Sequence, residues 1–199
     1  MVICHSKKCI FIHIPKTAGT SIEQFIKNKG KNYIELLGVQ NDRSMHHLMA
    51  KEIKKLYPYQ FPTYYKFSIV RNPYDRLLSE YYWTPVKNLG YKAGKSKADF
   101  LYKVINIIAN NSYSDNIYYD HFIPQYMFIY DNTKLLIDHL FKYESLELAM
   151  PIIKKKLEID AELLHLNKTK IERIGWTTNQ KEKIYKLYKN DFILFGYEK

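Results

Sequence analysis

The sequence contains little cysteine and no long hydrophobic run. Cys4 and Cys9 are its two cysteines among 199 residues, and neither belongs to a Cys/His cluster with metal-ligand spacing. A disulfide framework and a structural zinc site are therefore excluded. No run of 18 apolar residues occurs and no apolar leader follows Met1, so we expect no transmembrane segment, no N-terminal anchor and a cytoplasmic protein.

Acidic residues are scarce relative to basic ones. Asp and Glu number 20 against 31 Lys and Arg, which gives a net charge of +11. The excess favours anionic partners, although a genome-composition bias toward lysine is the other explanation. Because the lysines are spread along the chain and no RRM, KH, zinc-finger or basic-zipper signature occurs, we expect no nucleic-acid partner. An anionic donor nucleotide and a polyanionic acceptor account for the same charge.

One stretch near the start has the pattern of a strand, a loop and a helix. Residues 9–14 form an almost continuous apolar run, as in a strand covered on both faces. Pro15 and Gly19 interrupt this run, and Thr20 with Glu23 predicts a capping box at the start of the helix. The apolar face of the helix, which extends to about residue 29, consists of Ile22, Phe25 and Ile26.

The loop between this strand and helix is suited to binding a phosphate. Amides at the helix start, the positive end of the helix dipole and the Lys16 side chain converge on it, and Gly19 lets the backbone approach an anion. The motif GxxxxGK[ST] is absent and the lysine precedes the glycine. The loop is therefore not the ordinary loop of nucleoside-triphosphate enzymes.

The same pattern occurs again, and it predicts the fold class. Residues 65–70 form a second strand, Pro73 opens a helix that extends to about residue 86, and a third strand is predicted at 135–143. Further helices are predicted at 47–56, 98–109 and 179–189 and from 146, with a bend at Pro151. We expect residues 1–199 to form one α/β domain. It is a P-loop-like three-layer sandwich, with a central parallel sheet flanked by helices and ligands beyond the carboxyl ends of the strands.

Two motifs carry a resemblance to a known family. FIHIPKTAGTSIE, at 11–23, resembles the 5′-phosphosulfate loop of carbohydrate sulfotransferases, the group that includes heparan sulfate 2-O- and 6-O-sulfotransferases. FSIVRNPYDRLLSEYY, at 67–82, resembles the 3′-phosphate motif of this sulfotransferase family. Weaker similarities in HHLMAKEI, HFIPQ, FKYESL and DFILFGY extend the resemblance over nearly the whole chain. The resemblance implies transfer of a sulfuryl group from 3′-phosphoadenosine 5′-phosphosulfate (PAPS) to a hydroxyl of an acceptor, expected to be a carbohydrate, by in-line attack.

The resemblance also assigns the residues that bind the donor. The residues whose backbone amides would hold the 5′-phosphate are Thr17, Ala18, Gly19, Thr20 and Ser21, with the hydroxyls of Thr17, Thr20 and Ser21 as further donors. Lys16 would stabilise the oxygen that bridges phosphate and sulfate as negative charge grows there. Arg71 and Ser79 would bind the 3′-phosphate, although Arg71 could instead pair with Asp75 or Glu80. The loop at 167–169 occupies the place where the family covers the adenine and the 3′-phosphate.

A histidine is the expected base, since its pKa is matched to neutral pH. The resemblance favours His47, with Glu52 at the equivalent spacing, and His46 is the rival. Neighbours on a helix point about 100° apart, so we expect one of the two to face the donor; the alternative is that both are surface or capping residues. His13 is expected to be a buried core residue, and His121 to position the acceptor.

No metal is expected, because loop amides and Lys16 can offset the charge of the donor and the sequence has no acidic motif for Mg²⁺. Two other functions stay open. One is a P-loop-like kinase or nucleotide hydrolase that uses Lys16 on ATP. The other is a basic, non-catalytic protein that binds polyanions. The identity of the acceptor and the oligomeric state do not follow from the sequence.

Overall fold

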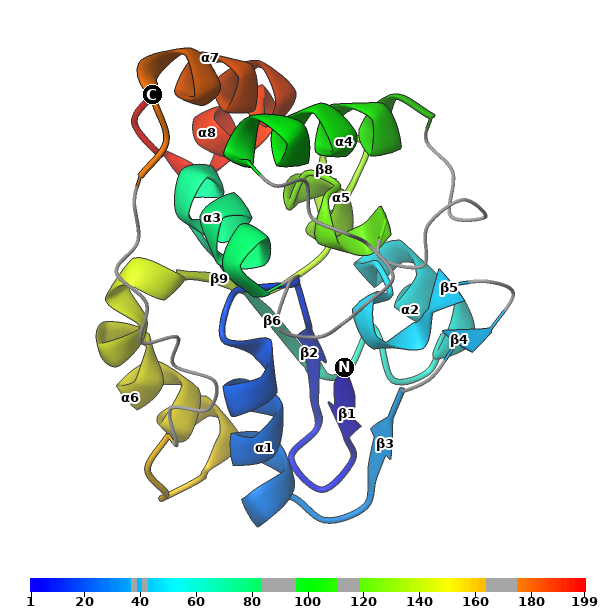
Figure 1. Ribbon diagram of the computed structural model, residues 1–199. Helices are drawn as coiled ribbons and strands as arrows, with labels where there is room; N and C mark the ends of the chain where they lie inside the picture. The colour runs from blue at the N-terminus through cyan, green and yellow to red at the C-terminus, as the bar shows by residue number, and fades with distance from the viewer. Residues whose placement is uncertain (37–38, 41–42, 84–95, 111–118, 164–174) are drawn as a thin grey trace.

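The computed structural model describes residues 1–36, 39–40, 43–83, 96–110, 119–163 and 175–199 (Figure 1). The strands are β1 Val2–Cys4, β2 Cys9–Ile12, β3 Tyr33–Glu35, β4 Val39–Gln40, β5 Arg43–Ser44, β6 Tyr65–Val70, β7 Tyr130–Asp131, β8 Lys134–Leu135 and β9 His139–Lys142. The helices are α1 Gly19–Lys29, α2 Ala50–Leu56, α3 Pro73–Trp83, α4 Lys97–Asn110, α5 Tyr126–Ile129, α6 Leu146–Leu157, α7 Thr178–Leu187 and α8 Lys189–Phe195. Short 3-10 turns are η1 Met45–His47, η3 Tyr119–His121 and η4 Tyr143–Ser145.

The central sheet has the order β3-β1-β2-β6-β9. Strands β2, β6 and β9 are parallel, and Phe67 of β6 lies between Phe11 and His139 in the register. This confirms the predicted α/β class; the central sheet, expected to be parallel, is mostly parallel. One further strand is not among those predicted from the sequence. Residues Val2–Cys4 form a buried strand, antiparallel to both β2 and β3.

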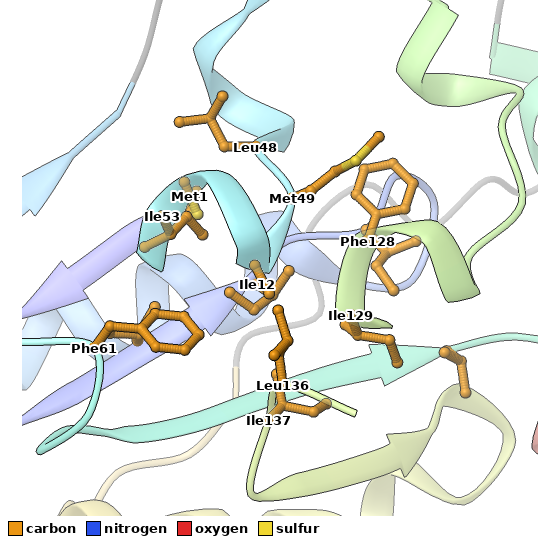
Figure 2. Close-up of a cluster of buried hydrophobic side chains, with 14 of the residues drawn as sticks. Met1, Ile12, Leu48, Met49, Ile53, Phe61, Phe128, Ile129, Leu136 and Ile137 are labelled. Carbon is orange, nitrogen blue, oxygen red and sulfur yellow. The ribbon is translucent and has the colours of Figure 1, made fainter. Parts of the chain in front are cut away.

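Side chains of the central strands point alternately to the two faces of the sheet, and each face forms a separate hydrophobic core. The sheet and the helices on its two faces make three layers. Ile10 and Ile12 point to one face and pack with residues of α2 and α5. Figure 2 shows residues of this core, among them Ile12 of β2, Ile53 of α2 and Phe128 of α5. Cys9, Phe11 and Phe67 belong to the opposite face, which α1 and α6 cover (Figure 1). Since strand side chains alternate with a period of two, a run that is apolar at every position requires a cover on both faces.

A third apolar cluster lies beyond the carboxyl ends of the parallel strands. Leu77 of α3, Phe100 of α4, Ile184 of α7 and Phe192 of α8 pack together there, in the group of helices at the top of Figure 1. Most of the motif DFILFGY, at 191–197, thus belongs to helix α8. This cluster fixes α3, and α3 carries several of the side chains described below.

The two cysteines face each other across the β1–β2 hairpin. Cys4 and Cys9 are register partners, and both are buried free thiols, as expected from the apolar surroundings of Cys9. Within the part of the chain that the structure describes, no helix combines the length and the apolar character needed to cross a lipid bilayer. The predicted end of the third helix near residue 86 and the loop at 167–169 lie outside the described residues.

Candidate active site

The loop between β2 and α1 has an unusual backbone. Lys16 and Ala18 both have φ of 68°, in the left-handed region, and α1 begins at Gly19. A Cβ atom on Gly19 would lie 1.9 Å from the imidazole of His13. Glycine is therefore required because a histidine ring packs against the start of the helix, in addition to the close approach of an anion predicted from the sequence. The amides of the first turn of α1 have no acceptor within the helix and are therefore available to a ligand or to the loop.

Two of the predicted phosphate ligands also hold the shape of the loop. The buried Thr17 hydroxyl donates to the Ile14 carbonyl (2.8 Å), and the Ser21 amide donates to the Ala18 carbonyl (3.0 Å). These bonds close the turn that presents the remaining amides. Thr20 is exposed beside them at the first turn of α1.

Glu23 does not form the predicted capping box with Thr20. The N-cap is Ala18, and no side chain caps α1. The Glu23 carboxylate instead bonds His13 Nδ1 through Oε1 (2.8 Å) and His46 Nε2 through Oε2 (3.0 Å), and Oε1 also accepts from the Met1 amine. Burial alone would raise the pKa of Glu23, but the bonds from His13 and His46 outweigh it and hold the pKa well below its usual range. Glu23 is therefore a buried anion.

Four histidines meet beside this carboxylate. The centroid of the His47 ring lies 4.6 Å from the ring centroid of His13, 4.9 Å from that of His46 and 5.1 Å from that of His121. His47 and His46 stack with an interplanar angle of 22°. The rings of His46 and His47 both lie in this cluster because they belong to the 3-10 turn η1 and not to a regular helix, the geometry in which one of the two was expected to face the donor. The predicted helix at 47–56 begins only at Ala50, with the Glu52 carboxylate accepting from the Met49 amide (2.7 Å).

Burial determines the charge of the inner histidines. It lowers the pKa of His13 to about 4, and it lowers the pKa of His47 well below the usual value. His47 Nδ1 lies 3.0 Å from the His13 carbonyl oxygen, which can only accept, so Nδ1 carries the hydrogen and Nε2 the lone pair. Both rings are therefore neutral near pH 7.

A second buried carboxylate holds the fourth histidine. Glu80 Oε2 lies 2.9 Å from His121 Nδ1. Burial would raise the pKa of Glu80, but the interaction and hydrogen bond with His121, followed by the charges of Lys16 and Arg76, lower it below its usual value. The Trp83 ring stacks on His121 with centroids 5.2 Å apart, and Lys16 Nζ lies 4.5 Å from the Trp83 ring. Lys16, expected at the leaving group, thus lies in the same site as the histidines.

Arg71, at the end of β6, reaches the loop between β2 and α1, which is predicted to bind a phosphate. Its Nη1 donates to the Lys16 carbonyl (3.2 Å), and its guanidinium lies 4.2 Å from the Tyr143 ring. The Gln125 side chain accepts from the Arg71 amide (2.9 Å) and donates to the Arg71 carbonyl (2.8 Å). Asp191 of α8 in turn accepts from the Gln125 amide (2.8 Å). The two elements predicted for opposite ends of the donor are therefore adjacent.

Several of these residues had no predicted role. Arg76, 3% exposed, donates through Nε to Pro15 O (3.2 Å), through Nη1 to Ile123 O (3.0 Å) and through Nη2 to His121 O (2.9 Å). The signal that could have revealed it is a charged residue next to the apolar Leu77 and Leu78. Gln125 could have been found as the last residue of HFIPQ. Ser79 lies half-buried on α3, eight residues after Arg71.

One group of side chains has the composition of a metal site. Ligand atoms of His13, Glu23 and His46 lie within 4.8 Å of one another. Hydrogen bonds already join both carboxylate oxygens of Glu23 to these imidazoles, so a hydrogen-bonded network accounts for the arrangement. For an anion, the arrangement offers a helix start, Lys16 and Arg71 on one side and neutral imidazoles on the other. Such a site can bind a phosphate ester and accept a proton beside it.

The comparisons with known proteins agree with this geometry. A model described as Sulfotransferase family matches residues 1–198, nearly the whole chain. No curated protein and no solved structure matches it. The match includes the phosphate loop, Arg71 and the histidines, so the chain belongs to the sulfotransferase family, whose members transfer sulfuryl groups.

Proposed function

We propose that this sulfotransferase takes the sulfuryl group from PAPS and transfers it to a hydroxyl of a carbohydrate. The observation that carries the proposal is the bond from the Arg71 guanidinium to the carbonyl of Lys16. It brings a bidentate anion ligand against a loop that itself suits an anion, and a donor phosphorylated at both its 3′ and 5′ positions needs two such sites. A carbohydrate acceptor rests on the resemblance to heparan sulfate sulfotransferases.

In this proposal the loop binds the 5′-phosphate and Arg71 the 3′-phosphate. The amides of Thr17, Ala18, Gly19, Thr20 and Ser21 would surround the 5′-phosphate, as the resemblance assigns them. The Ser21 amide is also bonded to the Ala18 carbonyl, so its contribution is shared. Ser79 would join Arg71 at the 3′-phosphate.

The transfer itself exchanges one S–O bond for another. The acceptor oxygen forms a bond to sulfur as the bond from sulfur to the bridging oxygen breaks, and adenosine 3′,5′-bisphosphate leaves with the electron pair. Lys16 stabilises the charge that develops on the bridging oxygen. The hydroxyl proton passes to a histidine, for which the sequence predicts His47. Its lone pair on Nε2 is compatible with that role.

Calorimetry with adenosine 3′,5′-bisphosphate and with ATP tests the donor. We expect the bisphosphate to bind more tightly, and Arg71→Ala to remove the preference, because the 3′-phosphate distinguishes the two ligands. Tight ATP binding that survives Arg71→Ala would instead support a kinase or nucleotide hydrolase. Transfer of ³⁵S from labelled PAPS to heparosan, unsulfated chondroitin and dextran then tests the acceptor class. Binding without transfer to any hydroxyl compound would support a non-catalytic polyanion-binding protein.

A further inference from the structure

The ring and the backbone of His121 are both fixed by contacts, more than a residue that only positions an acceptor would require. Glu80 and Trp83 lie three residues apart on α3, a spacing that places them on the same side of a helix. Glu80 bonds the edge of the imidazole at Nδ1 (2.9 Å), and Trp83 stacks on its face with an interplanar angle of 17°. Arg76, from the same helix, fixes the His121 carbonyl (2.9 Å). Residues of one helix, α3, therefore contact the edge of the His121 ring, its face and its backbone carbonyl.

We propose that His121 is the catalytic base of the sulfuryl transfer and that Glu80 is the positioning residue that fixes its tautomer. The proposal rests on the proposed sulfotransferase function and replaces His47 in the role of base. An ionised carboxylate can only accept, so Nδ1 of His121 carries the hydrogen and Nε2 the lone pair. A base oriented by a third group is the arrangement that recurs in enzymes that activate a hydroxyl.

The chemistry balances with the residues present. As the acceptor oxygen bonds to sulfur, its proton moves to His121 Nε2, and the resulting imidazolium lies against the Glu80 carboxylate. The electron pair of the broken S–O bond leaves on the bridging oxygen, which Lys16 stabilises. Trp83 contacts both the base and this lysine, with Lys16 Nζ 4.5 Å from its ring. The proton acceptor and the leaving-group cation are therefore positioned by a single side chain.

The surroundings of His47 are less suited than those of His121 to stabilise an imidazolium. Its Nδ1 bonds a neutral carbonyl, and its ring contacts three further imidazoles, those of His13, His46 and His121. Burial first, and then these neighbours, hold the pKa of His47 well below its usual value. Among the described residues, the groups close to His121 include Glu80 and Arg76 from α3, His47 from η1 and, beyond Trp83, Lys16 from the loop. Glu80 is the anion among them, and it bonds His121.

Nitrogen-15 NMR of the full chain with adenosine 3′,5′-bisphosphate bound tests the tautomer without any acceptor. We expect neutral His121 to be protonated at Nδ1, and Glu80→Gln to lower the pH at which Nε2 becomes protonated. Glu80→Asp should restore part of that shift, which a merely structural role would not do. Neutral His121 protonated at Nε2 would overturn the proposal, because that nitrogen could not then accept a proton.

Kinetics with labelled PAPS and the best glycan acceptor supply the second arm. We expect His121→Asn to lower kcat about 10²- to 10⁴-fold, the usual contribution of a general base, with the bisphosphate affinity unchanged. His47→Asn should lower kcat less, and His139→Asn, on β9, should leave it unchanged. A larger loss in His47→Asn than in His121→Asn contradicts the proposal. A wild-type chain that fails to bind the bisphosphate refutes the proposed function itself, and the assignment of His121 as its base falls with it.

Discussion

The two strand–loop–helix units of the molecule reach a similar geometry by different means. In the unit of β2 and α1, the loop is shaped by its own backbone, through Lys16 and Ala18 in the left-handed region and a glycine packed under His13. In the unit of β6 and α3, distant side chains hold the loop. Gln125 accepts from the Arg71 amide, and Glu144 accepts from the Asn72 amide (2.7 Å).

Each unit also buries a glutamate that bonds a histidine. Glu23 of α1 joins His13 and His46, while Glu80 of α3 joins His121. The first carboxylate is shared by three donors, His13, His46 and the Met1 amine, and belongs to a buried hydrogen-bonded network. The second bonds the His121 imidazole, which also contacts Trp83. The difference fits our proposals, in which the first unit binds the donor and the second takes up the proton.

The largest expected effect comes from breaking the backbone-shaped loop. In Gly19→Ala the new methyl group meets the His13 ring at 1.9 Å, so the ring or the helix start must move. We expect the free energy of unfolding to fall by about 3 kcal/mol, near the upper end for overpacking, and the affinity for adenosine 3′,5′-bisphosphate to fall about 100-fold. Urea denaturation and calorimetry measure these two changes. Gly175→Ala is the matched control, because nothing lies within 4 Å of its Cβ position. Equal behaviour of the two variants would show that the ring does not constrain the loop.

Acid should destabilise the protein through the first unit. Burial lowers the pKa of His13 from 6.5 in the unfolded chain to about 4 in the folded one. The unfolded chain therefore binds the proton more tightly, and the contribution of this histidine to stability, complete above pH 6.5, is lost as the pH falls toward 4. The loss amounts to about 3 kcal/mol at about 1.4 kcal/mol per pKa unit. Chemical denaturation between pH 4 and 7 should show this slope, and His13→Asn should reduce it by about one proton. An unchanged slope in that variant would place the titrating group elsewhere.

The second unit should weaken when its distant support is removed. Gln125→Ala deletes both hydrogen bonds to the Arg71 backbone, at a cost of about 1–3 kcal/mol for buried polar groups left unsatisfied. Because Arg71 then loses its position, we expect the affinity for the bisphosphate to fall about tenfold, and that for adenosine 5′-phosphate, which lacks the 3′-phosphate, to change little. Similar losses for both nucleotides would mean that Gln125 supports the whole site and not Arg71 in particular.

The smallest expected effect is on the contact between the two units. Trp83→Phe keeps an aromatic face beside Lys16 and His121 but weakens the cation–π contact, which is worth about 0.5–1 kcal/mol at partly exposed sites. We expect kcat for sulfate transfer to fall about threefold, with donor affinity preserved. Trp83→Leu removes the ring and should lower kcat further. Identical rates for Phe and Leu would remove any role for the ring in placing Lys16.

Patterns within one unit of sequence could be predicted. The strand at 65–70 has the predicted bounds, and the loop before α1 was found because proline, lysine and glycine follow an apolar run. The strand Val2–Cys4 was not predicted, since three apolar residues beside polar ones carry too weak a period to be distinguished from a loop.

The candidate site could be predicted only in part, because separate segments assemble it. Glu80 meets His121 across 41 positions of sequence, and Arg71 meets Gln125 across 54. No spacing rule links residues so far apart. The capping-box pattern at Thr20 and Glu23 shows the converse problem, since a local rule matched a glutamate that the tertiary structure uses for two histidines.

Arg76 joins segments on two sides of the candidate site. Its planar guanidinium binds carbonyl groups of Pro15, before the loop between β2 and α1, and of His121 and Ile123. The spacing between these segments is therefore fixed by one buried side chain bonded to main-chain atoms. Under the proposed function, exchanging residues around the site would change which hydroxyl compound is recognised while this spacing stays constant.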